Sequence, residues 1–278
     1  MRVADLLLAG MADTDDFGMA VDAADAQDVA AMLALADHPD SDVRRVVAST
    51  LPLLTHGDPP TPEMVTVAAR LTLDSDIGVR DWACFALAQQ WRDVDTPDLR
   101  ETLAARLDDI DRDARSEALV GLAFRQDPRA LPRVREALSR PSGNVWRLEM
   151  VAAGALSDPA LHELVGRHQE GWSNEIGVST AHAVRRLTDP TGPGADLLDG
   201  VAELYRRLAH GWPDGDALTA WHVMDEMIDI APHRAGEFLD AVLARLTGDP
   251  AAERQVLERS ALAQAAAEHR TPTRDRRD

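Results

Sequence analysis

The sequence predicts an all-α fold, an α-solenoid of about six to seven stacked antiparallel helix pairs. The first observation behind this prediction is a capping side chain followed by proline. Such pairs stand at Thr61-Pro62, Thr96-Pro97, Asp127-Pro128, Asp158-Pro159 and Asp189-Pro190. Proline is tolerated at the first position of a helix, because the N–H that it lacks would have no intrahelical partner there. Each pair therefore indicates a helix start, and the starts recur every 31 to 35 residues.

The second observation is an arginine near the beginning of every second helix. The series consists of Arg44, Arg80, Arg115 and Arg147, which lie 36, 35 and 32 residues apart. Because the arginines alternate with the proline starts, each period contains two helices. A period of this length with two helices is typical of hairpins that stack on one another to bury their apolar faces.

Apolar residues at helical spacing define the expected elements. In order along the chain they cover residues 25–36, 43–54, 62–73, 77–91, 97–107, 112–125, 128–139, 144–156, 159–169, 174–187, 196–209, 216–230, 235–246 and 251–268. We expect residues 25–268 to form a single solenoid, with a break in register at the proline–glycine stretch 188–195. Residues 1–24 are expected to be an acidic segment, loosely ordered at 11–24, and residues 269–278 a disordered, arginine-rich tail.

Three positions in each second helix are predicted to face the core. They lie one residue before the arginine and three and seven residues after it, and these offsets share one helical face. The residues are Val43, Val47 and Leu51, then Val79, Ala83 and Leu87, then Ala114, Ala118 and Leu122, then Trp146, Met150 and Gly154. The small side chains among them allow neighbouring hairpins to approach closely.

Two stretches carry the repeat pattern most clearly. Residues 74–83 read Asp-Ser-Asp-Ile-Gly-Val-Arg-Asp-Trp-Ala, and residues 108–123 repeat the same order of aspartate, arginine and alanine. This pattern resembles HEAT repeats, particularly the short bacterial form that also occurs in phycobilin-lyase-like proteins. The resemblance is strong over residues 37–160 and weak after residue 190. It implies a superhelix in which the second helix of each pair lines a concave, partner-binding face.

The resemblance also implies roles for the repeated charged residues. It implies that the four arginines are structural and that each bonds to an aspartate of a neighbouring repeat. The aspartates that it assigns to turns, helix caps or these pairs are Asp74, Asp76, Asp108 and Asp111. The resemblance therefore assigns Arg44, Arg80, Arg115 and Arg147 to the architecture.

The chain of 278 residues is acidic, with 48 aspartates and glutamates against 29 basic residues and a net charge of −19. All of these basic residues are arginines, which excludes a phosphate-binding or Schiff-base lysine. Nucleic acids and anionic membrane surfaces attract basic proteins, so we expect neither as a partner. The charge favours a basic protein or peptide, although it is just as often a device for solubility.

The sequence predicts a cytoplasmic protein without a cofactor. Its single cysteine, Cys84, excludes an intramolecular disulfide and a zinc site built from several cysteines. The apolar run at residues 6–9 is too short for the core of a signal peptide. No apolar run approaches the roughly 18 residues that a membrane-spanning helix needs.

The tryptophans indicate a binding surface. Trp82 lies two residues after its arginine, off the core positions, and the same place in the next two repeats is held by Glu117 and Glu149. Stacked in register, these side chains would form a ladder, with Asp81 and Gln89 beside it. An aromatic ring next to carboxylates binds arginine or lysine through cation–π and charge-assisted contacts. The alternative is that Trp82 packs between repeats and that the glutamates pair with arginines.

One helix carries a weaker candidate for metal binding or acid–base chemistry. His222 stands one turn before Glu226, and Asp225 flanks them. An imidazole and carboxylates on one face can hold a divalent metal or transfer protons. Such a set is more often a solvated helix face with one contact along it. We therefore predict neither a metal site nor a catalytic residue.

Three functions are consistent with these observations. We favour a non-catalytic scaffold or adaptor that binds a protein or peptide, basic in character, on an acidic concave face. An immunity-type protein that neutralises a basic toxin is an alternative that the same charge would serve. The third is a HEAT-fold enzyme of the DNA glycosylase or bilin lyase type, although base excision needs a basic groove that this composition argues against.

Overall fold

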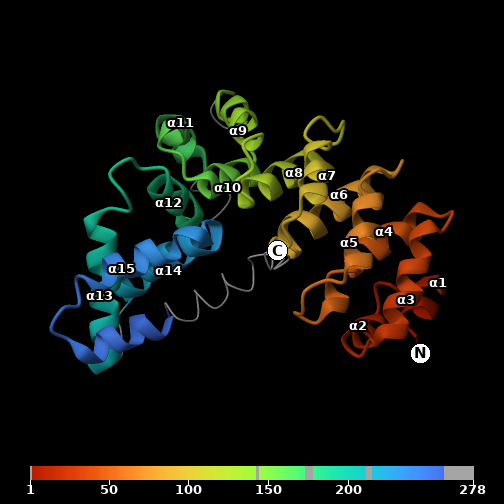
Figure 1. Cartoon of the computed structure of the whole chain (residues 1–278), viewed down its shortest axis with the longest axis horizontal. Helices are drawn as coiled ribbons and strands as arrows, with labels where there is room; N and C mark the ends of the chain where they lie inside the picture. Colours follow the sequence, from red (N-terminus) through yellow and green to blue (C-terminus); the bar gives the residue numbers. More distant parts are fainter. Residues whose placement is uncertain (1, 142–143, 173–177, 211–214, 260–278) are drawn as a thin grey trace, which may run out of the picture. The chain divides into compact units, whose positions relative to one another are not determined.

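The structure, a computed structural model, describes residues 2–141, 144–172, 178–210 and 215–259 (Figure 1). These residues form helices joined by turns, and no strand occurs among them. Consecutive helices pack against one another as pairs, which confirms the predicted all-α repeat architecture. The chain divides into two compact units, Met1–Arg125 and Gln126–Asp278, which we call unit 1 and unit 2. The predicted tail at 269–278 lies outside the described residues.

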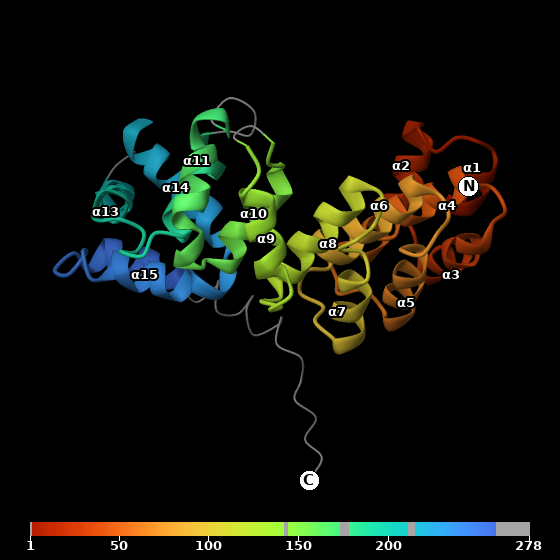
Figure 2. The ribbon, with the colours of Figure 1, turned by 90° about the horizontal axis from the view of Figure 1, so that it is seen from above.

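Unit 1 consists of two layers of helices. Its helices are α1 (Val3–Leu8), α2 (Asp15–Asp22), α3 (Ala26–Ala34), η1 (Leu35–Asp37), α4 (Ser41–Thr50), η2 (Leu53–Thr55), α5 (Pro62–Leu71), α6 (Ile77–Phe85), the π-helical turn η3 (Ala86–Gln90), α7 (Pro97–Ala104) and α8 (Arg112–Phe124). The second helices α4, α6 and α8 contact one another in succession, while α5 packs on α6 and α7 on α8. Figure 2 shows α5 and α7 on one side of the second helices.

The acidic N-terminal segment is helical, and the expectation of a loosely ordered stretch at residues 11–24 is wrong. Thr14 caps α2 by accepting a hydrogen bond from the N–H of Phe17 at 3.3 Å. Phe17 and Val21 are buried, and α2 packs against α1. The aspartates that make this segment acidic lie on the exposed side, so a small apolar face is sufficient to hold it.

Unit 2 has the same organisation. Its helices are α9 (Ala130–Leu138), α10 (Arg147–Leu156), η4 (Pro159–Leu161), α11 (His162–Trp172), α12 (Val178–Leu187), α13 (Ala195–His210), α14 (Gly215–Ile230), η5 (Pro232–Arg234), α15 (Ala235–Leu243) and a last described helix at 250–259. The helices α10, α12 and α14 contact one another, and α9, α11 and α13 pack on them. Residues 188–195, the expected break in register, lie inside this unit. Among the described residues no helix combines the length and apolarity needed to cross a bilayer.

The threonine caps begin the first helices of unit 1 as predicted. Thr61 Oγ1 accepts a hydrogen bond from the N–H of Met64 at 3.2 Å at the start of α5. Thr96 Oγ1 accepts one from the N–H of Leu99 at 3.2 Å at the start of α7. The proline that follows each threonine occupies the first helical turn.

The pair Asp189-Pro190 does not begin a helix, and the helix predicted at 196–209 is present as α13. The carboxylate of Asp189 accepts a hydrogen bond from the N–H of Thr191 at 2.8 Å in a turn, and α13 begins only at Ala195. Gly192 and Gly194 have φ angles of 94° and 90°, which are left-handed conformations that a right-handed helix cannot contain. The two glycines therefore delay the helix beyond the proline.

The predicted core positions are buried except Val43, which is half-buried, and Trp146. The residues three and seven places after the arginines of α4, α6 and α8 are all buried; they are Val47, Leu51, Ala83, Leu87, Ala118 and Leu122. The prediction is wrong for Trp146, which is 43% exposed, whereas Val145 is buried. Because α10 starts at Arg147, Trp146 is its N-cap residue and does not lie on the helical face.

Arg125 closes the end of unit 1. Its buried guanidinium donates hydrogen bonds to four backbone carbonyls, those of Val94 at 2.9 Å, Gly121 at 2.8 Å, Leu87 at 2.8 Å and Trp91 at 3.0 Å. Two of these carbonyls lie in or directly after η3, where the π-helical turn interrupts the regular hydrogen-bond ladder. Burial lowers the pKa of Arg125 to about 10.

Candidate functional site

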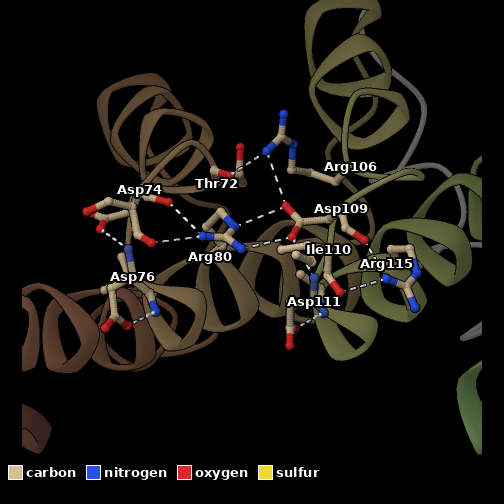
Figure 3. A network of polar contacts seen from close by, with 12 residues as sticks. Thr72, Asp74, Asp76, Arg80, Arg106, Asp109, Ile110, Asp111 and Arg115 are labelled. Atoms are coloured by element: carbon tan, nitrogen blue, oxygen red, sulfur yellow. Dashed lines mark hydrogen bonds and ion pairs between the residues drawn. The ribbon is translucent and has the colours of Figure 1, made fainter.

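Two arginines of unit 1 each join one repeat to the next. Nε and Nη2 of Arg44 donate to the two carboxylate oxygens of Asp74 at 2.7 and 2.8 Å. The same two groups of Arg80 donate to Asp109 at 3.0 and 2.9 Å. In each case Nη1 donates to two carbonyl oxygens of the turn before its own helix, which Figure 3 shows for Arg80. One guanidinium therefore holds its own turn and the aspartate of the following repeat.

The aspartates of these pairs also shape the turns. Asp74 and Asp109 accept hydrogen bonds from the N–H groups of Asp76 and Asp111, each at 2.9 Å (Figure 3). Asp76 and Asp111 in turn cap α6 and α8. Asp108, which the resemblance places among these residues, is exposed, and Asp109 beside it is the buried partner. Asp74 and Asp109 each lie six residues before the arginine of their own repeat, which is Arg80 for Asp74 and Arg115 for Asp109.

The pKa values of both paired aspartates are low. The hydrogen bonds from Arg44 lower the pKa of Asp74, and they outweigh the effect of its burial. Burial raises the pKa of Asp109, but hydrogen bonds from Arg80 and from the N–H of Asp111 bring it below its ordinary value. Both carboxylates are therefore charged at neutral pH, and the pairs are ionic.

The series of pairs ends with unit 1. Nη1 of Arg115 donates to the carbonyl oxygens of Asp109 and Ile110, the latter at 2.9 Å, as the earlier arginines do in their turns. Six residues before Arg147, where Asp74 and Asp109 stand in their repeats, the sequence has Pro141. Arg147 itself is exposed and makes no ion pair among the described residues.

Trp82 and Phe85 form an exposed aromatic pair on α6. Trp82 is 39% exposed, and its ring meets the half-buried ring of Phe85 edge to face, with centroids 5.5 Å apart. A perpendicular arrangement of this kind is favourable for two aromatic rings. The contact holds the indole in place while leaving much of it to solvent.

Asp81, next to this pair, is a half-buried carboxylate with an unusual pKa. Within the described residues it has no hydrogen bond or ion pair. Burial raises its pKa to about 6, and the charges of Asp113 and Asp111 on α8 add to the effect. Removing a carboxylate from water and placing like charges near it both disfavour its charged form. We call the surface formed by Asp81, Trp82, Phe85 and Asp113 the Trp82 face.

The two glutamates expected beside Trp82 have partners within their own units. Nε2 of Gln89 donates to both carboxylate oxygens of Glu117, at 3.0 and 2.7 Å. Glu149, in unit 2, accepts a hydrogen bond from the N–H of Trp146 at 2.9 Å and is paired with Arg140. Unit 1 thus brings Gln89 and the buried Glu117 together, and Glu149 caps α10.

A family model for HEAT repeats matches residues 64–156. This stretch contains the arginine–aspartate pair of Arg80 and the Trp82 face. Residues 64–156 are thus identified as HEAT repeats. The match begins in α5 and ends with α10, and thus includes the helix pairs α5–α6, α7–α8 and α9–α10.

Curated relatives of this chain include Protein YibA from Escherichia coli strain K12 and from Escherichia coli O157:H7. Each is 30% identical over 126 residues, which are 44% of this chain and 42% of the relative. The chain therefore spans less than half the length of these relatives. An X-ray structure of Escherichia coli YibA is 20% identical, with 66% of each chain covered and a TM-score of 0.48.

The weaker candidate at His222 lies in α14. Glu226 accepts a hydrogen bond from Thr180 at 2.6 Å, and Asp225 is paired with Arg259. His222 is exposed. No group of three or more potential metal-ligating side chains occurs among the described residues. Asp225 and Glu226 thus interact with neighbouring helices.

Two residues of the HEAT repeats were missed by sequence reasoning. Asp109 is the partner of Arg80, and a signal for it existed in its spacing of six residues from Arg115. Asp113 stands two residues before Arg115, at the position of Gly78 in the preceding repeat. The charge of Asp113 raises the pKa of Asp81 because α6 packs against α8, a contact that the local sequence does not reveal.

Proposed function

We propose that this protein is a non-catalytic scaffold that binds a basic segment of another protein on the Trp82 face of unit 1. The observation that carries the proposal is Asp81, a half-buried carboxylate that has no hydrogen bond or ion pair among the described residues. Folding has removed part of its hydration without supplying a counter-ion. The electrostatic attraction between a partner's cation and this carboxylate would therefore be stronger than that at a carboxylate fully in water.

The surroundings of Asp81 favour the same kind of partner. Trp82 offers an aromatic surface to a cation, and such contacts contribute roughly 0.5–1 kcal/mol at exposed sites. Glu117, a buried carboxylate of α8 that accepts hydrogen bonds from Gln89, adds negative charge to the same pair of packed helices. The net charge of −19 would steer a basic partner toward the protein. Glu149 is not part of the proposed site, because its carboxylate pairs with Arg140 and accepts a hydrogen bond from the N–H of Trp146 at the start of α10.

A repeat fold suits this function. Each hairpin adds surface without changing the packing of the others, so side chains off the core positions are free to serve recognition. Trp82 occupies such a position, whereas Val79 and Ala83 on the same helix are buried.

The experiment is a titration with a basic peptide containing equal numbers of lysines and arginines, followed by calorimetry and by nitrogen–proton correlation spectra of the indole groups. We expect the Trp82 resonance, assigned by its loss in Trp82→Phe, to shift. We expect Trp82→Ala and Asp81→Asn to weaken binding and high salt to weaken it further, because exposed charges are screened.

Trp146→Ala is the matched control, since Trp146 is a similarly exposed tryptophan in unit 2. Binding that is unchanged in Trp82→Ala, or a shift of the Trp146 resonance in place of that of Trp82, would show that the Trp82 face is not the site.

A further inference from the structure

We infer that the cation bound on the Trp82 face is the guanidinium of an arginine, which lies between the carboxylates of Asp81 and Asp113 and stacks on the ring of Trp82. This inference rests on the proposed function and specifies the side chain that the site selects. Its basis is a comparison between two successive contacts of neighbouring second helices, α4 with α6 and α6 with α8. We call each of these contacts a step of the repeat array.

At the step from α4 to α6, the chain supplies an arginine of its own. Arg45 stands one residue after the repeat arginine of α4, and Gly78 stands two residues before that of α6. A Cβ atom built on Gly78 would lie only 3.1 Å from Cδ of Arg45, so the aliphatic part of this arginine crosses over the glycine. Arg45 also forms an ion pair with Asp42 at 2.8 Å. The contact between these two helices is thus covered by the side chain of Arg45.

At the step from α6 to α8, the corresponding positions hold two carboxylates. Asp81 takes the place of Arg45, and Asp113 takes the place of Gly78. Because Arg45 lies against Gly78 where α4 packs on α6, the equivalent residues Asp81 and Asp113 face each other where α6 packs on α8. The charge of Asp113 accordingly raises the pKa of Asp81. The ion pair of Asp113 with its exposed neighbour Arg112 is long, at 3.5 Å. These two positions hold carboxylates where the preceding pair of helices has an arginine and a glycine, so they can accept a further cation from a partner.

The shape of the site favours arginine over lysine. A guanidinium is planar, donates several hydrogen bonds in a fixed fork and is less strongly hydrated than an ammonium group. It can therefore bond to both Asp81 and Asp113 and still lie flat on an indole. The indole of Trp82 is held by Phe85 at an interplanar angle of 89°, so the surface for stacking is already in place. A lysine would satisfy the charge without the stacking or the paired hydrogen bonds.

The test compares an oligoarginine peptide with an oligolysine peptide of equal length on the full chain, by calorimetry. We expect the oligoarginine to bind about fivefold tighter, and we expect Trp82→Ala to remove most of this difference. Asp81→Arg is a second variant that supplies the guanidinium from the chain itself, at the position equivalent to Arg45. We expect it to abolish oligoarginine binding while leaving the helical circular dichroism and the melting temperature no lower than in the wild type.

The outcomes separate this inference from the proposed function. If both peptides bind equally and both depend on Trp82, the scaffold function stands and the arginine preference is wrong. If neither peptide depends on Trp82 or Asp81, both proposals fail. Unchanged oligoarginine binding by a folded Asp81→Arg would also overturn the inference, because the site would then be filled by its own side chain.

Discussion

Arg80 holds Asp109 through two parallel hydrogen bonds, 3.0 Å from Nε to Oδ2 and 2.9 Å from Nη2 to Oδ1. Both side chains are buried, and they belong to successive helical hairpins. The remaining nitrogen of the same guanidinium holds the turn of its own hairpin, through Asp74 and Ser75. The pair therefore couples the position of one turn to the position of the next.

We expect Arg80→Ala to lower the free energy of unfolding of unit 1 by about 2–3 kcal/mol, because it removes the two hydrogen bonds of Arg80 to the buried carboxylate of Asp109. Asp109 keeps a longer bond from Arg106, at 3.2 Å, and the N–H of Asp111. Arg70→Ala is the control, since Arg70 and Asp37 form an exposed ion pair, and it should lose less than about 1 kcal/mol. Urea unfolding monitored by circular dichroism measures both values. Equal losses in the two variants would mean that the buried pair contributes no more than a surface contact.

We expect Arg125→Met to destabilise the end of unit 1 by about 3 kcal/mol or more. The substitution leaves four carbonyl oxygens without their donor, and each unsatisfied buried group costs about 1–3 kcal/mol before local relaxation. Hydrogen exchange should become faster at the amides of residues 86–94, which include the π-helical turn. Arg125→Lys keeps the charge but lacks the fork of donors, and wild-type protection in that variant would contradict the role assigned to the guanidinium.

We expect Asp81→Asn to stabilise the protein at pH 7 by about 1–2 kcal/mol. The pKa of Asp81 rises from 3.8 to about 6 on folding, so the folded state binds more protons than the unfolded state between these values. The free energy of unfolding of the wild type therefore falls as pH rises from about 4 to about 6, and stays lower above that range. One pKa unit corresponds to about 1.4 kcal/mol, and partial exposure reduces the full effect.

Urea unfolding at pH 4 and at pH 7 measures this difference. The wild type and Asp81→Asn should be equally stable at the lower pH, where Asp81 is largely protonated in the folded state. A constant difference across the range would show that the substitution acts through packing and not through the charge of Asp81.

We expect oligoarginine to bind about tenfold more weakly at pH 5 than at pH 7. A bound guanidinium favours the charged form of Asp81 and lowers its pKa, so binding below about pH 6 must first remove a proton. Calorimetry in two buffers of different ionisation enthalpy would detect the released proton. Asp81→Asn should lose this part of the pH dependence, and an unchanged profile would assign it to another group.

We expect Gly121→Ala to destabilise unit 1 by about 1–3 kcal/mol through overpacking. A Cβ atom at Gly121 would lie 2.7 Å from Cβ and 2.9 Å from Cα of Ala88, so α8 and η3 would have to separate. Gly236→Ala is the matched control, because this helical glycine of α15 has no atom within 4 Å of the added Cβ. It should be neutral or stabilising by up to about 1 kcal/mol, since alanine has the higher helix propensity. Thermal unfolding compares the two.

The sequence predicted the repeat architecture because its signals are local. A cap such as Thr61 or Thr96 acts on an N–H three residues away, and a core position such as Val47 or Ala83 depends only on helical spacing. Local signals failed where the backbone deviated from a helix. The glycines after Asp189 delayed α13, and the late start of α10 left Trp146 on the surface.

The candidate site was predicted in part for the same reason. The exposed position of Trp82 follows from its offset from the core positions of α6, and Asp81 follows from its neighbour. The sequence could not reveal that Glu117 bonds to Gln89 and that Glu149 caps its own helix. Side chains that are equivalent in the repeat differ in their partners, because the residues facing them across each step differ.

The amino-acid sequence by itself determined that this protein consists of stacked helix pairs and that its surface is strongly negative, since both properties come from residue types and their spacing along the chain. Only the tertiary structure decided which aspartate each arginine holds and which carboxylate is left without a partner. Both depend on pairs about 30 residues apart, Arg80 with Asp109 and Asp81 with Asp113. The packing of one helix against the next, and not the sequence around either residue, sets those distances.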